Sequence, residues 1–127
     1  MNISKAASAA GLPVKTVRYY GDIGLVSESG RSKAGYRTYD NAAIARLIFI
    51  RRARAIGFSL DECRELVELY QDGSRASADV KRIAGHRLEQ IEAKQRELAK
   101  LHQELSQLVE SCRGDAAADC PIIDYLG

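Results

Sequence analysis

Residues 77–111 read SADVKRIAGHRLEQIEAKQRELAKLHQELSQLVES, and the architecture of the chain follows from this segment. It contains no proline, and its only glycine is Gly85. The segment therefore predicts one helix of about 33 residues, roughly 50 Å long at 1.5 Å per residue. A compact monomer has no need for a helix of that length, so we expect it to serve association between chains.

An apolar seam runs along this predicted helix. Apolar side chains or a cysteine recur every seven residues on two interleaved sets of positions: Ile91, Leu98, Leu105 and Cys112, and Val80, Leu101 and Leu108. Arg87 and Lys94 interrupt the early half of the seam. A heptad seam is typical of a coiled coil, so it predicts a homodimer with parallel or antiparallel helices. The alternative is a helix that packs along its own domain.

Two thiols frame a short loop directly after the helix. Cys112 and Cys120 are separated by the seven residues RGDAAAD, most of which are small or acidic, and Pro121 follows the second thiol. Thiolates are soft ligands that select Cu(I), zinc or iron–sulfur clusters, but zinc and clusters normally take four protein ligands. The spacing leaves three hypotheses open: a two-coordinate monovalent ion, a disulfide-closed loop, or two unrelated cysteines.

Length and composition limit the cellular setting. The 127 residues suffice for one ordinary domain or a small domain with an extension. No run approaches the ~18 apolar residues of a membrane span, and the N-terminus lacks the apolar core of a signal peptide. We therefore expect a cytoplasmic protein without a membrane partner, where reduced thiols disfavour a structural disulfide. Cys63 stands alone in an amphipathic pattern and is predicted to pack in the core.

The charge of the chain is unevenly distributed. Residues 1–57 carry ten Lys or Arg and three Asp or Glu, a net charge of +7, whereas residues 58–127 carry nine and fourteen, a net charge of −5. A basic N-terminal part on an acidic remainder indicates a nucleic-acid-binding head on a body that does not bind nucleic acid.

The first 24 residues predict a helix-turn-helix. Ser4 is a candidate cap for a helix that ends at Gly11, and Leu12-Pro13 starts a second helix that ends near Gly24. The outward side of the second helix carries polar and basic residues suited to a major groove: Lys15, Thr16, Arg18 and Tyr19.

Residues 25–39 break the helical periodicity and predict a hairpin, or wing, with a tip at 29–35 and a strand at 36–39. Arg31, Lys33 and Arg37 are candidate phosphate contacts, which give salt-dependent affinity without sequence preference. Tyr36 is predicted either to pack or to touch a sugar.

Two further helices complete the predicted head. Asp40 caps residues 41–56, which carry Arg54 as a further candidate DNA contact, and Ser59 caps a helix that ends at Asp72-Gly73. The predicted fold is mainly α with a small β wing. It comprises a winged helix-turn-helix DNA-binding domain at 1–73, a dimerisation helix at 77–111, and a metal-binding loop with a C-terminal segment at 112–127.

The chain resembles the MerR family of transcriptional regulators, in particular its copper-efflux regulators. The matching stretches span nearly the whole chain: MNIS (1–4), VRYY (17–20), GLV (24–26), GYRTY (35–39), Arg54 with Gly57-Phe58, SADVK (77–81), and Cys112 with CPII (120–123). The resemblance implies a homodimer with a winged helix-turn-helix head, an antiparallel coiled coil and a two-cysteine loop.

The resemblance also implies the ligands. Cys112 and Cys120 correspond to the two thiolates that bind a linear Cu(I), with Ag(I) or Au(I) as alternatives. Ser77 stands where zinc- and mercury-responsive relatives carry a cysteine ligand. A bis-thiolate Cu(I) unit has a net charge of −1, which the start of the long helix and Lys81 would offset beside the metal.

The implied function is transcriptional activation without catalysis. The dimer binds double-stranded promoter DNA, and metal binding changes how it bends and twists that DNA, which affects RNA polymerase indirectly. A thiol-based redox regulator that uses the same cysteines is the main alternative. A metal-storage protein would leave the basic head unexplained.

Overall fold

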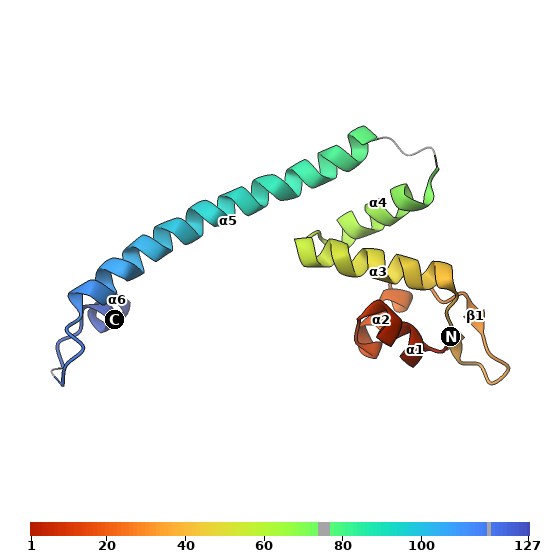
Figure 1. Cartoon of the computed structure of the whole chain (residues 1–127), viewed down its shortest axis with the longest axis horizontal. Helices are drawn as coiled ribbons and strands as arrows, with labels where there is room; N and C mark the ends of the chain where they lie inside the picture. Colours follow the sequence, from red (N-terminus) through yellow and green to blue (C-terminus); the bar gives the residue numbers. More distant parts are fainter. Residues whose placement is uncertain (74–76, 117) are drawn as a thin grey trace. The chain divides into compact units, whose positions relative to one another are not determined.

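The computed structural model describes residues 1–73, 77–116 and 118–127 (Figure 1). Its elements follow in this order: α1 (Ile3–Ala10), α2 (Val14–Asp22), β1 (Gly30–Arg31), β2 (Arg37–Thr38), α3 (Asn41–Ile56), α4 (Leu60–Gln71), α5 (Ser77–Ser111) and α6 (Pro121–Leu126). The predicted fold class is confirmed: the chain is mainly helical with a two-stranded wing. The chain divides into a first unit, residues 1–84, and a second unit, residues 85–127. Among the described helices, none combines the length and apolar character of a membrane span.

α1 begins one residue after its cap, Asn2. The Asn2 side chain accepts a hydrogen bond from the backbone N–H of Lys5 at 2.9 Å. The prediction that Ser4 caps this helix is wrong, because a β-bridge to Thr38 holds Asn2 in extended conformation directly before the first turn. The predicted end is confirmed: Gly11 has a φ of +72°, a conformation that glycine adopts without strain.

The end of α2 is held by a side chain from α4. Arg64 donates hydrogen bonds to the carbonyl oxygens of Ile23, at 2.9 Å, and Gly24, at 3.1 Å. The last carbonyls of a helix lack partners within it and carry partial negative charge, so a guanidinium stabilises them. This contact fixes the C-terminal turn of α2 against the rest of the first unit.

The wing is a short antiparallel pair. Gly30 pairs with Thr38 and Arg31 with Arg37. The N-terminus extends this pairing, because Met1 donates to the carbonyl of Tyr39 at 2.9 Å and accepts from its backbone N–H at 2.7 Å. The strands are shorter than predicted, so more of the hairpin belongs to its turn.

Local capping signals set the bounds of α3 and α4, as predicted. Asp40 accepts from the backbone N–H of Ala43 at 2.8 Å, and Gly57 ends α3 with a φ of +100°. Ser59 and Glu62 form a reciprocal capping box at the start of α4. The pKa of the Asp40 carboxyl is lowered, mainly by the hydrogen bond from the Ala43 N–H and further by a hydrogen bond from the side chain of Ser29.

The first unit encloses a continuous apolar core. Its fully buried side chains come from α1, α2, α3, α4 and the segments directly before and after the wing. The largest are Tyr39, Leu47, Ile50, Val17, Val26 and Cys63. Cys63 is completely buried, which confirms its predicted packing role. Each Å² of apolar surface that is removed from water stabilises the fold by roughly 25 cal/mol. Packing against this core is therefore the main contribution that holds α2 and the wing in place.

α5 runs from the first unit into the second. It has 35 residues, and its one buried residue is Ile83 in the first unit. The first unit fastens this end of the helix further through an ion pair between Arg82 and Glu65 at 2.7 Å. In the second unit, α6 begins at Pro121, a residue suited to the first turn of a helix, and this helix is absent from the sequence prediction.

Candidate nucleic-acid interface and thiol pair

The outward face of α2 presents the predicted polar residues. Lys15, Arg18 and Tyr19 are exposed and Thr16 is half-buried, whereas Val17 and Tyr20 are buried. The buried pair anchors α2 in the core, and this orientation directs the cationic side outward. All four predicted residues of α2 therefore lie on or beside its free face.

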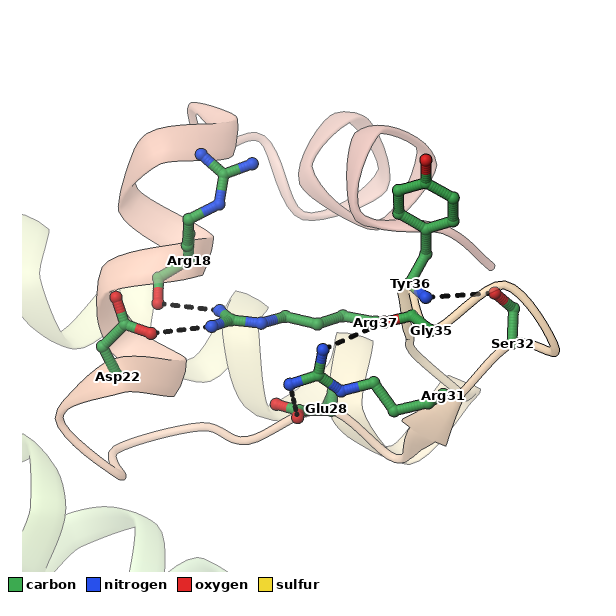
Figure 2. A network of polar contacts seen from close by, with 8 residues as sticks. All are labelled: Arg18, Asp22, Glu28, Arg31, Ser32, Gly35, Tyr36 and Arg37. Carbon is green, nitrogen blue, oxygen red and sulfur yellow. Dashed lines mark hydrogen bonds and ion pairs between the residues drawn. The ribbon is translucent and has the colours of Figure 1, made fainter.

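The wing carries exposed side chains beside α2. Arg31 forms an ion pair with Glu28 at 3.2 Å and donates to the carbonyl of Gly35 at 3.0 Å, yet its side chain stays 55% exposed (Figure 2). The pKa of the Glu28 carboxyl is lowered, mainly by a hydrogen bond from the backbone N–H of Glu28 itself and further by the charge of Arg31. Glu28 therefore stays ionised as the partner of Arg31. Tyr36 is 72% exposed, so of its two predicted roles the packing role does not apply in the free chain. Lys33 at the tip is also exposed.

A cleft of about 530 Å³ opens between the start of α1, α2 and the wing. Its described lining holds three arginines and no carboxylate, and comprises Asn2, Ile3, Ser4, Arg18, Arg31, Ser32, Gly35, Tyr36, Arg37 and Thr38. Figure 2 shows the Arg18 side chain and the Tyr36 ring extending to the same side of this region. The structure thus gathers four of the predicted DNA contacts around one cationic hollow: Arg18, Arg31, Tyr36 and Arg37.

Arg37 differs from the other cations of the cleft. Its guanidinium bonds the Asp22 carboxylate at 2.8 Å and the carbonyl oxygen of Arg18 at 3.2 Å (Figure 2). Its side chain is 22% exposed. Asp22 is a functional candidate that the sequence prediction missed, because the two partners lie 15 residues apart and no local pattern joins them.

Arg54 lies near the end of α3, outside the residues that line the cleft. It donates to the carbonyl oxygen of Phe58 at 2.7 Å, which ties it to the turn between α3 and α4. Arg54 nevertheless remains an exposed residue, so a cation is available at this second place on the first unit.

The structure brings the two predicted thiols together. Cys112 directly follows α5, Cys120 directly precedes α6, and their sulfur atoms are 3.7 Å apart. A disulfide bond is about 2.05 Å long, so these are two free thiols within contact of each other. Both residues are half-buried.

The backbone of α6 favours the thiolate form of Cys120. Hydrogen bonds from the N–H groups of Ile123 and then Ile122 lower the pKa of the Cys120 thiol, and a hydrogen bond with Cys112 acts in the same direction. The thiolate is the form that binds metals and attacks electrophiles. The local fold therefore prepares this sulfur for soft-ion chemistry.

The sulfur separation fits two thiolates on one metal ion. A zinc–thiolate bond of about 2.3 Å places two sulfurs about 3.8 Å apart in a tetrahedral shell and about 4.6 Å apart in line. The observed 3.7 Å matches the tetrahedral separation, and the sulfurs would have to move apart by about 0.9 Å to hold an ion in line. The distance therefore suits a shared ion but does not by itself favour the linear arrangement. Within residues 1–73, 77–116 and 118–127, no cluster of three or more His, Cys, Asp or Glu residues forms a metal site.

Ser77 and Lys81 are not brought to the thiols of their own chain. Both are exposed residues in the first two turns of α5, whereas Cys112 follows the last turn of the same 35-residue helix. In the loop, Asp115 pairs with Arg113 at 3.5 Å, and Asp119 is exposed.

Comparisons with known proteins agree with this arrangement. Residues 1–69 match the family described as MerR HTH family regulatory protein, and residues 44–108 match the family described as MerR, DNA binding. The chain is 48% identical over 126 residues to the HTH-type transcriptional regulator HmrR of Rhizobium leguminosarum bv. viciae, with 99% of this chain and 97% of HmrR covered. It is 47% identical over 126 residues to the HTH-type transcriptional regulator CueR of Salmonella typhimurium, with 99% and 91% covered.

A solved structure extends the match to the fold. The transcription regulator PbrR691 from Ralstonia metallidurans CH34, in complex with lead(II), superposes with a TM-score of 0.82 at 35% identity, and covers 100% of this chain and 99% of PbrR691. The predicted resemblance is confirmed: the chain belongs to the MerR family of helix-turn-helix transcription regulators, which bind DNA and are not enzymes.

Proposed function

We propose that this protein is a Cu(I)-responsive transcriptional activator of copper-efflux or detoxification genes, with Ag(I) or Au(I) as alternative inducers. The observation that carries the proposal is the thiol pair, Cys112 and Cys120, whose sulfurs lie 3.7 Å apart in a chain with a DNA-binding first unit. The structural relative PbrR691 was solved with a soft metal ion, lead(II), which supports a metal as the signal. Such a regulator acts in the cytoplasm, where thiols stay reduced.

The first unit supplies the DNA contacts. The second helix of a helix-turn-helix enters the major groove, so Lys15, Thr16, Arg18 and Tyr19 on α2 meet bases and nearby phosphates. The wing and α3 add further contacts to the sugar–phosphate backbone, from Arg31, Lys33, Tyr36 and Arg54. Arg37 lies among them in the wing, with its guanidinium bonded to Asp22.

A second copy of the chain covers the seam of α5. In the second unit, Leu98, Leu101 and Leu105 are each more than half exposed, at 62, 52 and 55%. Leu101 and Leu105 also line an apolar groove of about 320 Å³ with residues of α6. Exposed apolar residues in heptad register stabilise a coiled-coil dimer when a partner buries them.

An antiparallel dimer would complete the metal site. A 35-residue helix separates Ser77 from the thiols of its own chain by about 50 Å. When two helices run antiparallel, the start of one lies beside the end of the other, so Ser77 and Lys81 of one chain would meet the thiols of the second. Ser77 then offers a hydroxyl where a divalent ion would need another thiolate, and Lys81 offsets the negative charge of a bis-thiolate Cu(I) unit.

Metal binding must act through two conformations of the DNA-bound dimer. A ligand shifts an equilibrium only by its differential affinity for the two states. We propose that the metal-bound state bends and twists the promoter so that RNA polymerase can use it, because deformation of DNA is itself an energetic readout.

Binding of Cu(I) under reductant tests the proposal against the redox alternative. Native mass spectrometry of the protein with reductant and buffered Cu(I) should record one copper per chain. Cys112→Ser and Cys120→Ser should remove the copper, whereas Cys63→Ala, which removes the buried thiol, should retain it. A protein that takes up no copper, and instead loses two hydrogen atoms per chain on mild oxidation, would support the thiol redox regulator.

A further inference from the structure

Arg37 occupies a different chemical setting from the other cations of the wing. Arg31 is its direct partner across the β1–β2 pair. The Arg31 side chain is 55% exposed, whereas that of Arg37 is 22% exposed. The pair thus combines one cation open to a ligand with one cation that is largely covered.

The covered guanidinium joins the wing to the end of α2. One of its nitrogen atoms bonds the Asp22 carboxylate at 2.8 Å, and the other donates to the Arg18 carbonyl oxygen at 3.2 Å. Figure 2 shows the side chain reaching from the wing across to α2, where both acceptors lie. Arg18 is itself a proposed DNA contact, so this bond links the backbone of one contact residue to the strand that carries Arg31.

Gly21 provides a second, independent observation. A Cβ atom at Gly21 would lie 3.2 Å from a terminal nitrogen of Arg37, closer than ordinary van der Waals contact. Gly21 does not have a positive φ, so the backbone does not require glycine there, and glycine is a poor helix former. The missing side chain leaves room for the guanidinium.

The charges argue against Arg37 as a simple phosphate contact. Both arginines pair with a carboxylate, Arg31 with Glu28 at 3.2 Å and Arg37 with Asp22 at 2.8 Å, but only the Arg31 side chain is more than half exposed. Arg37, which is 22% exposed and has the shorter ion pair, must leave or share its partner to neutralise a phosphate. Asp22 also adds a negative charge at a surface that meets polyanionic DNA, which by itself weakens binding. The Asp22 carboxylate can still favour DNA binding if it holds the wing in the position in which the wing contacts DNA.

We infer that Arg37 is a positioning residue, which holds the wing against α2 through Asp22 and the Arg18 carbonyl so that Arg31 and Tyr36 meet the DNA backbone together with α2. The inference rests on the proposed DNA-binding function of the first unit, and it assigns Asp22 to the same task. Arg37 then contributes to affinity through the geometry of its neighbours, and the number of phosphates that the protein neutralises does not depend on it.

A salt-resolved double-mutant cycle tests this role. The full-length dimer is measured as unmodified protein, Asp22→Ala, Arg37→Ala and the double variant, on a two-fold symmetric duplex that the unmodified protein enriches from a random-sequence pool. Each single variant should weaken binding by about threefold to tenfold, as expected for one partly exposed charge pair. The double variant should bind no more weakly than the weaker single variant, because both changes remove the same link.

The dependence on salt separates positioning from phosphate contact. The slope of log K against log salt should stay unchanged in Asp22→Ala and Arg37→Ala. Arg31→Ala is the matched control in the same strand pair. It should reduce the slope by about 1.8, because each of the two protomers loses one phosphate contact worth about 0.9. Hydrogen exchange of wing amides should rise in both positioning variants and stay unchanged in Arg31→Ala. Arg37→Gln replaces Arg37→Ala if the latter fails to fold.

Three results would overturn the role of Arg37: a slope reduced by about 1.8 in Arg37→Ala, unchanged or tighter binding by Asp22→Ala, or losses that add in the double variant. A slope that also stays unchanged in Arg31→Ala would instead contradict the proposed use of the wing on DNA. The two failures are therefore distinguishable.

Discussion

The two units of the chain differ in how much of their apolar surface is buried. Every buried apolar residue in the described part of the chain lies between Ala6 and Ile83, in the first unit. In the second unit, Leu98 and Val109 are 62 and 56% exposed, and α6 exposes Leu126 at 74%. Because burial of apolar surface is the main stabilising force in folding, the first unit is stabilised within one chain, whereas we expect the second unit to be stabilised by the proposed dimer.

The largest effect is expected from a charge in the seam of the second unit. Leu101→Glu places a carboxylate where a second helix should pack, and an unpaired buried charge costs several kcal/mol. The dimer dissociation constant should rise at least about a hundredfold. Gln103→Glu adds the same charge to an exposed position off the seam and should leave the dimer intact. If sedimentation velocity records an unchanged dimer for Leu101→Glu, the α5 seam is not the dimer interface.

DNA binding should depend on the first unit. Arg18→Ala removes an exposed cation from the outward face of α2 in each protomer. It should weaken operator binding by about 1–3 kcal/mol, or roughly fivefold to over a hundredfold, for each half-site. Lys100→Ala removes an exposed cation from α5 in the second unit and should have no measurable effect. Fluorescence anisotropy on the selected duplex measures both, and equal losses would contradict the division of tasks between the units.

The thiols of the two units should differ in reactivity. The N–H groups of Ile123 and Ile122 lower the pKa of Cys120, whereas burial raises the pKa of Cys63. As the pH rises, Cys120 should reach its thiolate form before an ordinary cysteine, and Cys63 after one.

Alkylation by iodoacetamide requires an accessible thiolate, so Cys120 should react about tenfold faster than Cys63, or more. Peptide mass spectrometry after timed labelling gives both rates. Urea is the control, because unfolding should bring the two rates together. Equal rates in the native protein would contradict the expected difference between Cys120, whose pKa is lowered, and the buried Cys63.

A smaller effect is expected from the helix caps of the first unit. Ser59→Ala removes one half of the capping box of α4 and should lower the free energy of unfolding by about 1 kcal/mol. Ser8→Ala changes an exposed residue inside α1 and should alter it by less than about 0.5 kcal/mol. Urea unfolding compares the two variants. An equal change in both would mean that the cap does not stabilise α4.

Sequence predicted best where one local signal decides the structure. Asp40, Gly57 and Ser59 act within one turn of their own helices, and the bounds of α3 and α4 follow them. The proximity of Cys112 and Cys120 was also predictable, because a short loop with glycine can fold back between two nearby thiols.

Predictions from the sequence failed where contacts between residues far apart in the chain determine the local structure. Asn2 became the cap of α1 because Thr38, from the wing, holds it in extended conformation. The partner of Arg37 depends on how the wing packs on α2, and no spacing rule predicts Asp22. α6 was missed because its six residues are too few to show a helical periodicity.

The most direct test of the proposed function is promoter output in a reducing transcription extract at buffered free concentrations of Cu(I), Ag(I) or Zn(II). Two thiolates satisfy a linear monovalent ion but leave zinc without its tetrahedral shell. We expect Cu(I) and Ag(I) to activate and zinc to fail, and Ser77→Cys to gain a response to zinc. Cys112→Ser and Cys120→Ser should lose activation by copper while they still bind the operator, and Cys63→Ala should respond normally. Equal activation by zinc in the unmodified protein, or a copper response that survives the loss of either loop thiol, would contradict the account.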